Sequence, residues 1–294
     1  MLDIVKQSAE VLQFPVQTKK DSASVVVVVP CYNEEKRLNS AAFVKFLDMD
    51  PTATLLFVND GSKDNTLEVL AEIHRRRPEQ VEVISLERNG GKAEAVRLGI
   101  QHAANSGAAY IAYWDADLAT PLEYVEDFVK TARRFPTLRV VYGSRRQMLG
   151  HKINRTLTRR AISRTCSALA QVATDLPIRD TQCGAKLLKN TPELRQAIAT
   201  PFTAGWLFDI ELFTRLSNIV ANKYTAFYEM ALPEWNEIEG SKVTAKAIIK
   251  AGMTMLKLIM QNRFSMPIGK KHIVMNSIRT EVICSRAQNI TFFA

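Results

Sequence analysis

Tyr110-Ile-Ala-Tyr-Trp-Asp-Ala-Asp117 is an apolar, β-favouring stretch that ends in two carboxylates one residue apart. Such a run predicts a strand. Alternate side chains of an extended chain point to the same side, so Asp115 and Asp117 can bind one ligand together. Paired carboxylate oxygens suit a hard divalent cation, which in turn can hold a diphosphate. Pairs of this kind also occur in ordinary strand-exit turns, so the interpretation rests on the elements around them.

Four more apolar runs repeat this strand-like character. They are Val25–Val29, Leu55–Val58, Val81–Leu86 and the shorter Val140–Tyr142. Stretches of helical character lie between the strands, near residues 36–48, 64–76, 91–105 and 121–135. Continuous β-branched runs suit strands that are buried on both faces. Strands that alternate with helices predict an α/β fold, with a mostly parallel sheet flanked by helices.

Polar and charged side chains follow each predicted strand at the point where it ends. Besides the carboxylate pair, they are Asn33-Glu34, Asn59-Asp60, Arg88-Asn89 and Arg145-Arg146. Ligands of open α/β sheets bind outside the carboxyl ends of the strands. The repeated coincidence therefore predicts one binding site along this edge of the sheet.

A glycine-rich turn, Asn89-Gly-Gly-Lys92, opens the third predicted helix. Backbone N–H groups at a helix start, together with the lysine, suit a phosphate group. The turn is not a Walker A loop, and no Gly-x-Gly-x-x-Gly follows the first strand, which argues against a dinucleotide oxidoreductase. After the second strand, Asp60 can accept hydrogen bonds from a base or ribose, and a plain cap for the next helix is the alternative.

The chain has 294 residues, a formal net charge of +9 and a sequence pI of about 9.4. This charge favours anionic partners, which are nucleic acid, nucleotide phosphates or an acidic membrane surface. The four cysteines are scattered without metal-ligand or redox spacing, so we expect reduced thiols in a cytosolic setting. No apolar run is long enough to predict a membrane-spanning helix.

Two segments of the second half indicate contact with a membrane surface. One is a basic cluster that can bind a lipid phosphate and anionic head groups. It comprises Arg145, Arg146, Lys152, Arg155, Arg159, Arg160 and Arg164. Aromatic residues are not interleaved with these charges, so we do not expect nucleic acid as a partner. The other segment, residues 245–260, predicts an amphipathic helix with lysines along one edge, suited to a bilayer interface; a helix packed on the domain is the alternative.

In this order and spacing, the motifs resemble the family-2 glycosyltransferases with a GT-A fold, a Rossmann-like nucleotide-binding architecture, over about residues 24–245. Three further segments look like the dolichyl-phosphate β-glucosyltransferase branch of the polyprenyl-phosphate glycosyltransferases. They are Asp180-Thr-Gln-Cys-Gly-Ala-Lys186, Gly205-Trp-Leu-Phe-Asp-Ile-Glu211 and Trp235-Asn-Glu-Ile-Glu-Gly-Ser-Lys242. The chain departs from the pattern at Asn59, where many members have an aspartate. It also shows no transmembrane helix of the kind found at one end of many relatives.

The resemblance implies a metal-dependent inverting hexosyltransferase. The donor it indicates is a nucleotide sugar, UDP-glucose, and the acceptor is a polyprenyl or dolichyl phosphate. The resemblance also implies a donor site that holds Mg²⁺ or Mn²⁺ on the two carboxylates of Asp115 and Asp117. The donor residues it implies are Pro30, Tyr32 and Glu34 around the nucleoside, Asp60 at the base or ribose, and Lys92 and Arg145 at the phosphates.

Three residues are expected to serve catalysis, namely Asp117, Arg145 and Asp209. Asp209 falls near the place where inverting members carry a catalytic aspartate. An acceptor phosphate is already ionised at neutral pH, so no base is required, and Asp209 can equally orient the acceptor or cap its helix. Ser241, Lys242 and Arg155 are expected to bind the acceptor, with Lys242 as a point charge for its phosphate; a solvated lysine is the alternative.

We expect an N-terminal helix and linker over residues 1–22, a GT-A glycosyltransferase domain over 23–243, and an amphipathic helix with a tail over 244–294. The expected location is cytoplasmic, peripheral on the cytosolic face of a membrane. Two alternatives stay open. One is a soluble family-2 glycosyltransferase with a non-lipid acceptor, and the other is an inactive sugar-nucleotide-binding module.

Overall fold

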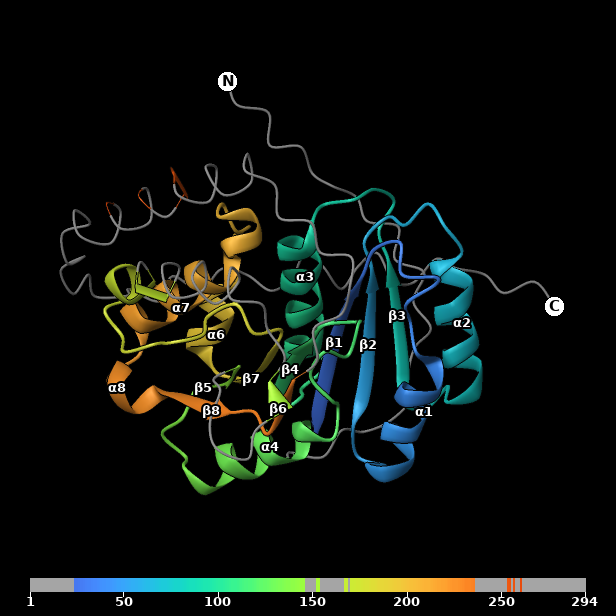
Figure 1. Ribbon diagram of the computed structural model, residues 1–294, viewed down its shortest axis with the longest axis horizontal. Coiled ribbons are helices and arrows are strands. Elements are labelled where there is room, and N and C mark those ends of the chain that lie inside the picture. The colour runs from blue at the N-terminus through green and yellow to red at the C-terminus, as the bar shows by residue number, and fades with distance from the viewer. Residues whose placement is uncertain are drawn as a thin grey trace, which may run out of the picture.

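In a computed structural model, the apolar runs of the sequence form a seven-stranded sheet (Figure 1). The structure describes residues 24–145, 152–153, 167–168 and 170–235, together with residues 253, 254, 256 and 260. The strands of the sheet are β1 (Val25–Cys31), β2 (Thr54–Asn59), β3 (Val81–Ser85), β4 (Tyr110–Trp114), β5 (Val140–Ser144), β7 (Ala185–Lys189) and β8 (Phe227–Ala231). All five runs predicted as strands are confirmed. The segment from Arg179 to Leu188 also predicts a turn followed by a strand, and β7 confirms that strand.

The sheet has the strand order β3-β2-β1-β4-β7-β5-β8. β1 pairs in parallel with β2 and β4, β2 pairs in parallel with β3, and β5 pairs in parallel with β8. β7 runs antiparallel between β4 and β5. The expected mostly parallel sheet is therefore confirmed. The insertion of β7 was not predicted, because the apolar character of a strand does not encode which strands will lie beside it.

Helices cover both faces of the sheet, and Figure 1 shows α3 lying beside β1 and β4. The helices are α1 (Ser40–Met49), α2 (Thr66–Arg76), α3 (Lys92–Asn105), α4 (Tyr124–Arg134), α6 (Pro192–Ala197), α7 (Phe208–Ile219) and α8 (Lys223–Ala226), with a 3-10 helix η1 (Gly205–Leu207) before α7. One apolar core joins the sheet to α1, α2 and α4. A second core joins the opposite face to α3, α6 and α7.

The valines of β1 explain why this strand lies at the centre. Val25, Val27 and Val29 belong to the first core, and Val26 and Val28 belong to the second. Each buried valine stabilises the fold by roughly 1.5–3 kcal/mol relative to an exposed one. On the second face, a Cβ added at Gly99 of α3 would overlap the Val28 side chain, so glycine lets α3 pack directly on β1.

Some expectations concern segments outside the described residues. They include the N-terminal helix over 1–22 and most of the amphipathic segment over 244–294, so the domain boundaries remain predictions. From the sequence, the basic stretch from His151 to Arg164 is also predicted to be helical, and this prediction is wrong at Lys152–Ile153. These two residues form strand β6 and pair in parallel with β9 (Glu234–Trp235). Within the part of the chain that the structure describes, no helix has the length and apolar character needed to cross a bilayer.

Candidate active site

The parallel strands bring most of the predicted donor residues to one edge of the sheet. Glu34 follows β1, Asp60 follows β2, Lys92 begins α3, and Asp115 and Asp117 follow β4. Because β2, β1 and β4 are neighbours in the sheet, the loops after their carboxyl ends lie side by side. The edge therefore gathers carboxylates and cations from four segments that are distant in sequence.

Asp115 lies between the end of β4 and the turn that enters β7. Its backbone N–H donates to the carbonyl oxygen of Gly184 over 3.0 Å, and Lys92 Nζ donates to Asp115 Oδ1 over 2.5 Å. A Cβ added at Gly184 would overlap the Asp115 carboxylate. Gly184 is thus a site residue that the prediction missed, although it lies inside one of the segments that carried the resemblance.

Asp117 lies two residues further and contacts a cation from another loop. Arg37 Nη2 donates to Asp117 Oδ2 over 3.3 Å, and Arg37 Nε lies 3.3 Å from Glu34 Oε2. The backbone N–H of Ala119 donates to Asp117 Oδ1 over 3.1 Å and so fixes the carboxylate. Arg37 was not among the predicted residues. Its one sequence signal was a charge three residues beyond Glu34, in a loop already expected at the site.

Burial and mutual repulsion act on the carboxylates of this corner. Burial raises the pKa of Glu34, as do the charges of Asp117 and Asp115, while Arg37 opposes the shift. Burial, followed by the charge of Asp115, also raises the pKa of Asp117. A carboxylate in such surroundings gains from a nearby cation. The carboxylates of Glu34, Asp115 and Asp117 therefore favour a bound cation.

The two aspartates fit a divalent metal ion but supply only part of its ligand set. They offer hard oxygen donors at alternate positions, which suits Mg²⁺ or Mn²⁺. Among the described residues, no group of three or more His, Cys, Asp or Glu side chains forms a metal-binding arrangement. Phosphate oxygens and water would have to complete the coordination, as is usual for Mg²⁺ bound to a nucleotide.

Asp60 holds the glycine-rich turn in place. Its Oδ1 accepts a hydrogen bond from the Gly90 N–H over 2.7 Å, and its Oδ2 accepts one from the Gly91 N–H over 2.9 Å. Burial raises the pKa of Asp60, although both of these hydrogen bonds oppose the shift. The structure thus gives Asp60 a contact with the backbone of the glycine-rich turn. Its expected contact with a base or ribose stays a prediction.

Asn59 takes part in the same support of the edge. Its Nδ2 donates to Ser85 Oγ over 2.9 Å, and its Oδ1 accepts from the Ser62 N–H over 3.3 Å. The amide can do both at once because it carries a donor and an acceptor. A departure from the family pattern at this position therefore still leaves β2, β3 and the following turn connected.

The segment after β1 is fixed to the start of α2. The Glu34 N–H donates to Thr66 Oγ1 over 2.8 Å, and Ser62 Oγ accepts from the Asn33 N–H over 3.0 Å. Pro30 lies within β1, and Tyr32 follows it with 42% of its surface exposed.

A hollow of about 490 Å³ opens beside the segment that follows β1. It is lined by Asn33, Glu35, Lys36, Arg37, Lys63 and Asp64. The lining does not include Tyr32 or Asp60, so the hollow is a neighbour of the predicted nucleoside pocket.

Arg145 is engaged by a carboxylate of its own. Its Nε and Nη2 donate to the two carboxylate oxygens of Asp180, each over 2.8 Å, and its guanidinium lies 5.3 Å from the centre of the Trp235 ring. This bidentate pair uses two of the five N–H donors of the side chain. A phosphate contact by Arg145, which remains a prediction, would have to use the remaining donors.

Asp209 is enclosed rather than open to an acceptor. Only 4% of its surface is exposed. Lys186 Nζ lies 3.0 Å from Asp209 Oδ1, and the Tyr113 hydroxyl donates to the same oxygen. Lys186 Nζ also donates to the Cys183 carbonyl over 2.5 Å. These contacts favour the structural alternative for Asp209 over the role of a base. Lys186 is a third residue, after Gly184 and Arg37, that the prediction left without a role.

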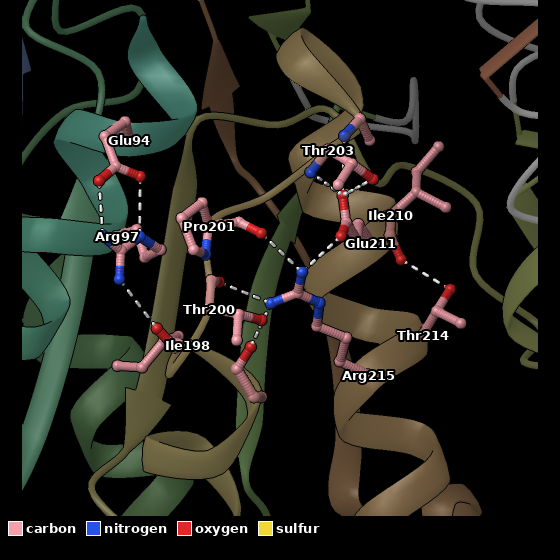
Figure 2. Close-up of polar contacts among 12 residues, drawn as sticks. Glu94, Arg97, Ile198, Thr200, Pro201, Thr203, Ile210, Glu211, Thr214 and Arg215 are labelled. Carbon is pink, nitrogen blue, oxygen red and sulfur yellow. Dashed lines mark hydrogen bonds and ion pairs between the residues drawn. The ribbon is translucent and has the colours of Figure 1, made fainter. Parts of the chain in front are cut away.

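A network of hydrogen bonds anchors the loop that leads into α7, as Figure 2 shows. Glu211 Oε2 accepts from the N–H groups of Thr203 and Ala204, each over 2.8 Å. Arg215 donates to the carbonyls of Thr200 and Pro201, each over 2.9 Å, and Arg97 of α3 donates to the carbonyl of Ile198 over 3.2 Å (Figure 2). This loop therefore carries η1 and Asp209 on a fixed base.

The predicted acceptor site cannot be described in the same way. Ser241, Lys242 and Arg155 lie outside the described residues, and so do Arg146 and most of the basic cluster. Their roles remain predictions. Of the amphipathic segment, Met253, Leu256 and Met260 are described, with 61%, 59% and 55% of their surfaces exposed.

Known proteins of similar sequence act on a lipid phosphate according to their names. Residues 26–192 match the sequence profile of Glycosyl transferase family 2. A dolichyl-phosphate beta-glucosyltransferase of Trichomonas vaginalis is 31% identical over 261 residues, which make up 85% of this chain and 74% of that protein. The dolichyl-phosphate beta-glucosyltransferase of Drosophila melanogaster is 32% identical, over 79% of this chain and 72% of that protein.

Solved structures share the fold at lower identity. A crystal structure of glucosyl-3-phosphoglycerate synthase from Mycobacterium tuberculosis, in complex with Mn²⁺, UDP-glucose and phosphoglyceric acid, matches with a TM-score of 0.60. The match covers 80% of this chain and 79% of that chain at 17% identity. The likeness shows the arrangement of sheet and helices, and the site residues have to be judged by their own contacts.

Proposed function

Since the chain belongs to Glycosyl transferase family 2 and has the GT-A fold, we propose that it transfers glucose from UDP-glucose to a dolichyl or other polyprenyl phosphate. The acceptor and the sugar follow the names of the relatives, which are dolichyl-phosphate beta-glucosyltransferases. UDP-glucose follows the crystal structure of similar fold that contains it with Mn²⁺. The proposed product is a β-linked polyprenyl-phosphate glucose.

One observation carries the proposal that the chain is active. Asp115 and Asp117 end a buried strand at the carboxyl edge, and each lies within 3.3 Å of a cationic side chain. Two costly carboxylates beside a third one, Glu34, are expected where a metal ion takes part in the reaction, and they speak against a module that has lost catalysis. A bound Mg²⁺ or Mn²⁺ would supply electrostatic stabilisation of the departing diphosphate.

The proposed reaction is a direct displacement at the anomeric carbon. An oxygen of the acceptor phosphate forms a new bond to this carbon, while the bond to the donor diphosphate breaks and its electron pair leaves with UDP. Lys92 would bind the diphosphate at the start of α3, where the helix dipole also favours an anion. The N–H groups of Gly90 and Gly91 already donate to Asp60. Positioning and charge are the contributions of the protein, because the acceptor oxygen is already ionised.

Asp209 is proposed to position the site rather than to accept a proton. Its carboxylate oxygen Oδ1 is occupied by Lys186 and Tyr113, and its side chain is buried. Tyr113 belongs to β4 and Lys186 to β7, so the cluster joins the strand before Asp115 to the strand after Gly184. Such a cluster stiffens the base of the carboxylate pair.

We further propose that the enzyme is peripheral on the cytosolic face of a membrane, because its acceptor is a lipid. Met253, Leu256 and Met260 support this proposal, since their spacing of three and four residues places them on one helical face and all three are exposed. Exposed apolar side chains beside lysines suit an interface with anionic lipid.

Transfer can be tested with purified full-length protein, Mg²⁺ or Mn²⁺, and radiolabelled donors. UDP-glucose and GDP-mannose are each offered with dolichyl phosphate and, in separate reactions, with water-soluble phosphates such as phosphoglyceric acid. The proposal predicts label from UDP-glucose in the organic phase. Label that stays on a water-soluble acceptor would instead favour the soluble glycosyltransferase, and metal-dependent binding of UDP-glucose with no transfer at all would favour a binding module.

A further inference from the structure

Each carboxylate of the proposed metal site already has an organic cation. Lys92 Nζ lies 2.5 Å from Asp115 Oδ1, and Arg37 Nη2 lies 3.3 Å from Asp117 Oδ2. The side chains of Lys92 and Arg37 are 44% and 43% exposed, so both can move without disturbing the core. In the free enzyme, these cations occupy the surroundings that a metal ion would need.

The charges around Asp115 and Asp117 disfavour the binding of a metal ion alone, and they also disfavour the binding of a diphosphate alone. Glu34, Asp115 and Asp117 contribute three negative charges, and Arg37 and Lys92 contribute two positive ones. A divalent cation bound alone would lie beside two cations that already hold its ligands. A diphosphate bound alone would lie beside three carboxylates. Like charges a few ångströms apart repel strongly when they are partly removed from water.

Both conflicts would disappear if the two ligands bound together. Asp115 and Asp117 would offer their oxygens to the metal ion, and the released groups of Arg37 and Lys92 would be free to meet the phosphate oxygens. Arg37 suits this exchange because Glu34 holds its Nε at 3.3 Å, so Nη2 can leave Asp117 while the guanidinium stays at the site. The backbone of Glu34 is fixed in turn by Thr66.

We propose that Arg37 and Lys92 are exchangeable counter-ions, which neutralise Asp117 and Asp115 in the free enzyme and move to the donor diphosphate when metal binds. Metal and nucleotide then bind as a strongly coupled pair, and Arg37 is a donor-binding residue in addition to those predicted from the sequence. The inference rests on the proposed function, since it assigns a diphosphate and a divalent metal to this corner. The incomplete protein ligand set agrees with it.

The coupling can be measured without any turnover. Free Mn²⁺ is followed by its electron paramagnetic resonance signal while the full-length protein is titrated, first alone and then with saturating UDP. Wild type is expected to bind Mn²⁺ at least about tenfold more tightly with UDP than without it, within the usual range for coupled sites. Arg37→Met is expected to bind Mn²⁺ alone several-fold more tightly than wild type, and to lose most of the enhancement by UDP.

Three further variants separate the contact from the general effect of charge. Lys36→Met removes the same charge one residue away, at a side chain with no contact to the carboxylate pair among those the structure describes, and should leave Mn²⁺ affinity close to wild type. Arg37→Lys keeps the charge and should restore part of the coupling. The double variant Glu34→Gln/Arg37→Met has the net charge of wild type, and its affinity for Mn²⁺ alone should still exceed that of wild type.

The arm with Mn²⁺ alone decides the inference. If Arg37→Met binds Mn²⁺ alone as weakly as wild type, or more weakly, Arg37 does not compete for Asp117 and the inference is wrong. The arm with UDP tests the proposed donor. Wild type that binds Mn²⁺ but never UDP would contradict the proposed function, while tighter Mn²⁺ binding by Arg37→Met in the same experiment would still support the counter-ion role.

Discussion

Lys186 Nζ lies 3.0 Å from Asp209 Oδ1, in a fully buried pair beneath the carboxyl edge of the sheet. Burial lowers the pKa of Lys186 to about 7 and raises that of Asp209 well above its ordinary value. These opposite shifts, together with the contact, favour one proton shared by the two groups, and the pair would then carry no net charge. Both contacts of Asp209 fall on Oδ1, and the burial of its side chain separates the carboxylate from an incoming acceptor.

Separating the pair should give two variants whose stabilities depend on pH in opposite directions. In Asp209→Asn, the remaining Lys186 is neutral in the folded state above about pH 7. In the unfolded state it stays charged up to its ordinary pKa of 10.5. The unfolded state then binds more protons, so the free energy of unfolding rises with pH. In Lys186→Met, the remaining Asp209 keeps a proton that the unfolded state loses above its ordinary pKa of 3.8, so stability falls as pH rises.

Urea unfolding between about pH 6 and pH 9 measures both slopes, each at most about 1.4 kcal/mol per pH unit. Wild type and the double variant Lys186→Met/Asp209→Asn serve as references. For both references, the free energy of unfolding should change little with pH in this range. The folded and unfolded states of each hold equal numbers of protons at these two positions. Slopes of the same sign in the two single variants would contradict a shared proton.

Gly184→Ala should damage the carboxylate site without unfolding the protein. The added Cβ would overlap the Asp115 carboxylate, which must then move away from its place beside β7. A displacement of about 1 Å in a reacting geometry can cost about 100-fold in rate, so we expect a loss of that order in metal-dependent glucose transfer. Gly107→Ala is the matched control. It is strained by a φ of +85° but meets nothing within 4 Å, so it should lower stability and leave transfer by the folded protein unchanged.

Asp60→Asn should weaken donor binding through the glycine-rich turn. The carboxylate of Asp60 accepts N–H groups from Gly90 and Gly91, whereas an amide would turn an NH₂ group toward one of them. We expect the Kd for UDP in the presence of Mn²⁺ to rise about tenfold, as calorimetry can measure. Asp50→Asn alters a carboxylate that also accepts two backbone N–H groups, at 3.0 and 3.2 Å, but away from this edge. Equal losses of affinity in both variants would argue against a specific role for Asp60.

The exposed apolar face should be needed for contact with lipid. Leu256→Ser/Met260→Ser removes two exposed side chains, each of which contributes about 1.5–3 kcal/mol if it is buried in a bilayer interface. Flotation with phosphatidylserine-containing vesicles should show a loss of binding of at least about tenfold. Met49→Ser changes a side chain that is 52% exposed on α1 and should float like wild type. Undiminished flotation of the double variant would show that this face is not needed for lipid binding.

The main features of the fold could be predicted because they depend on local pattern. The valine run of β1 and the apolar run of β4 are buried on both faces, and such strands have a strong signature in sequence. The position of β7 between β4 and β5 could not be predicted, because strand order is decided by packing between segments far apart in the chain.

Local sequence pattern predicts some residues of the site, but it does not predict those that act through contacts between distant segments. Asp115, Asp117 and Lys92 lie at strand ends and helix starts that the pattern locates, and the structure brings them together. Arg37 and Lys186 act across loops and strands, through contacts with residues 80 and 23 positions away. Nothing in the neighbouring sequence marks such partners.

The most direct measurement is the initial rate of glucose transfer from radiolabelled UDP-glucose into an organic extract containing dolichyl phosphate. Wild type is compared with Asp117→Asn and with Asp127→Asn, which removes an exposed carboxylate on α4. Lipid-linked label is expected with wild type and Asp127→Asn in the presence of Mg²⁺ or Mn²⁺. No label above background is expected with Asp117→Asn or after chelation. Transfer to the lipid that persists unchanged in Asp117→Asn would contradict the proposed metal-dependent glucosyltransferase.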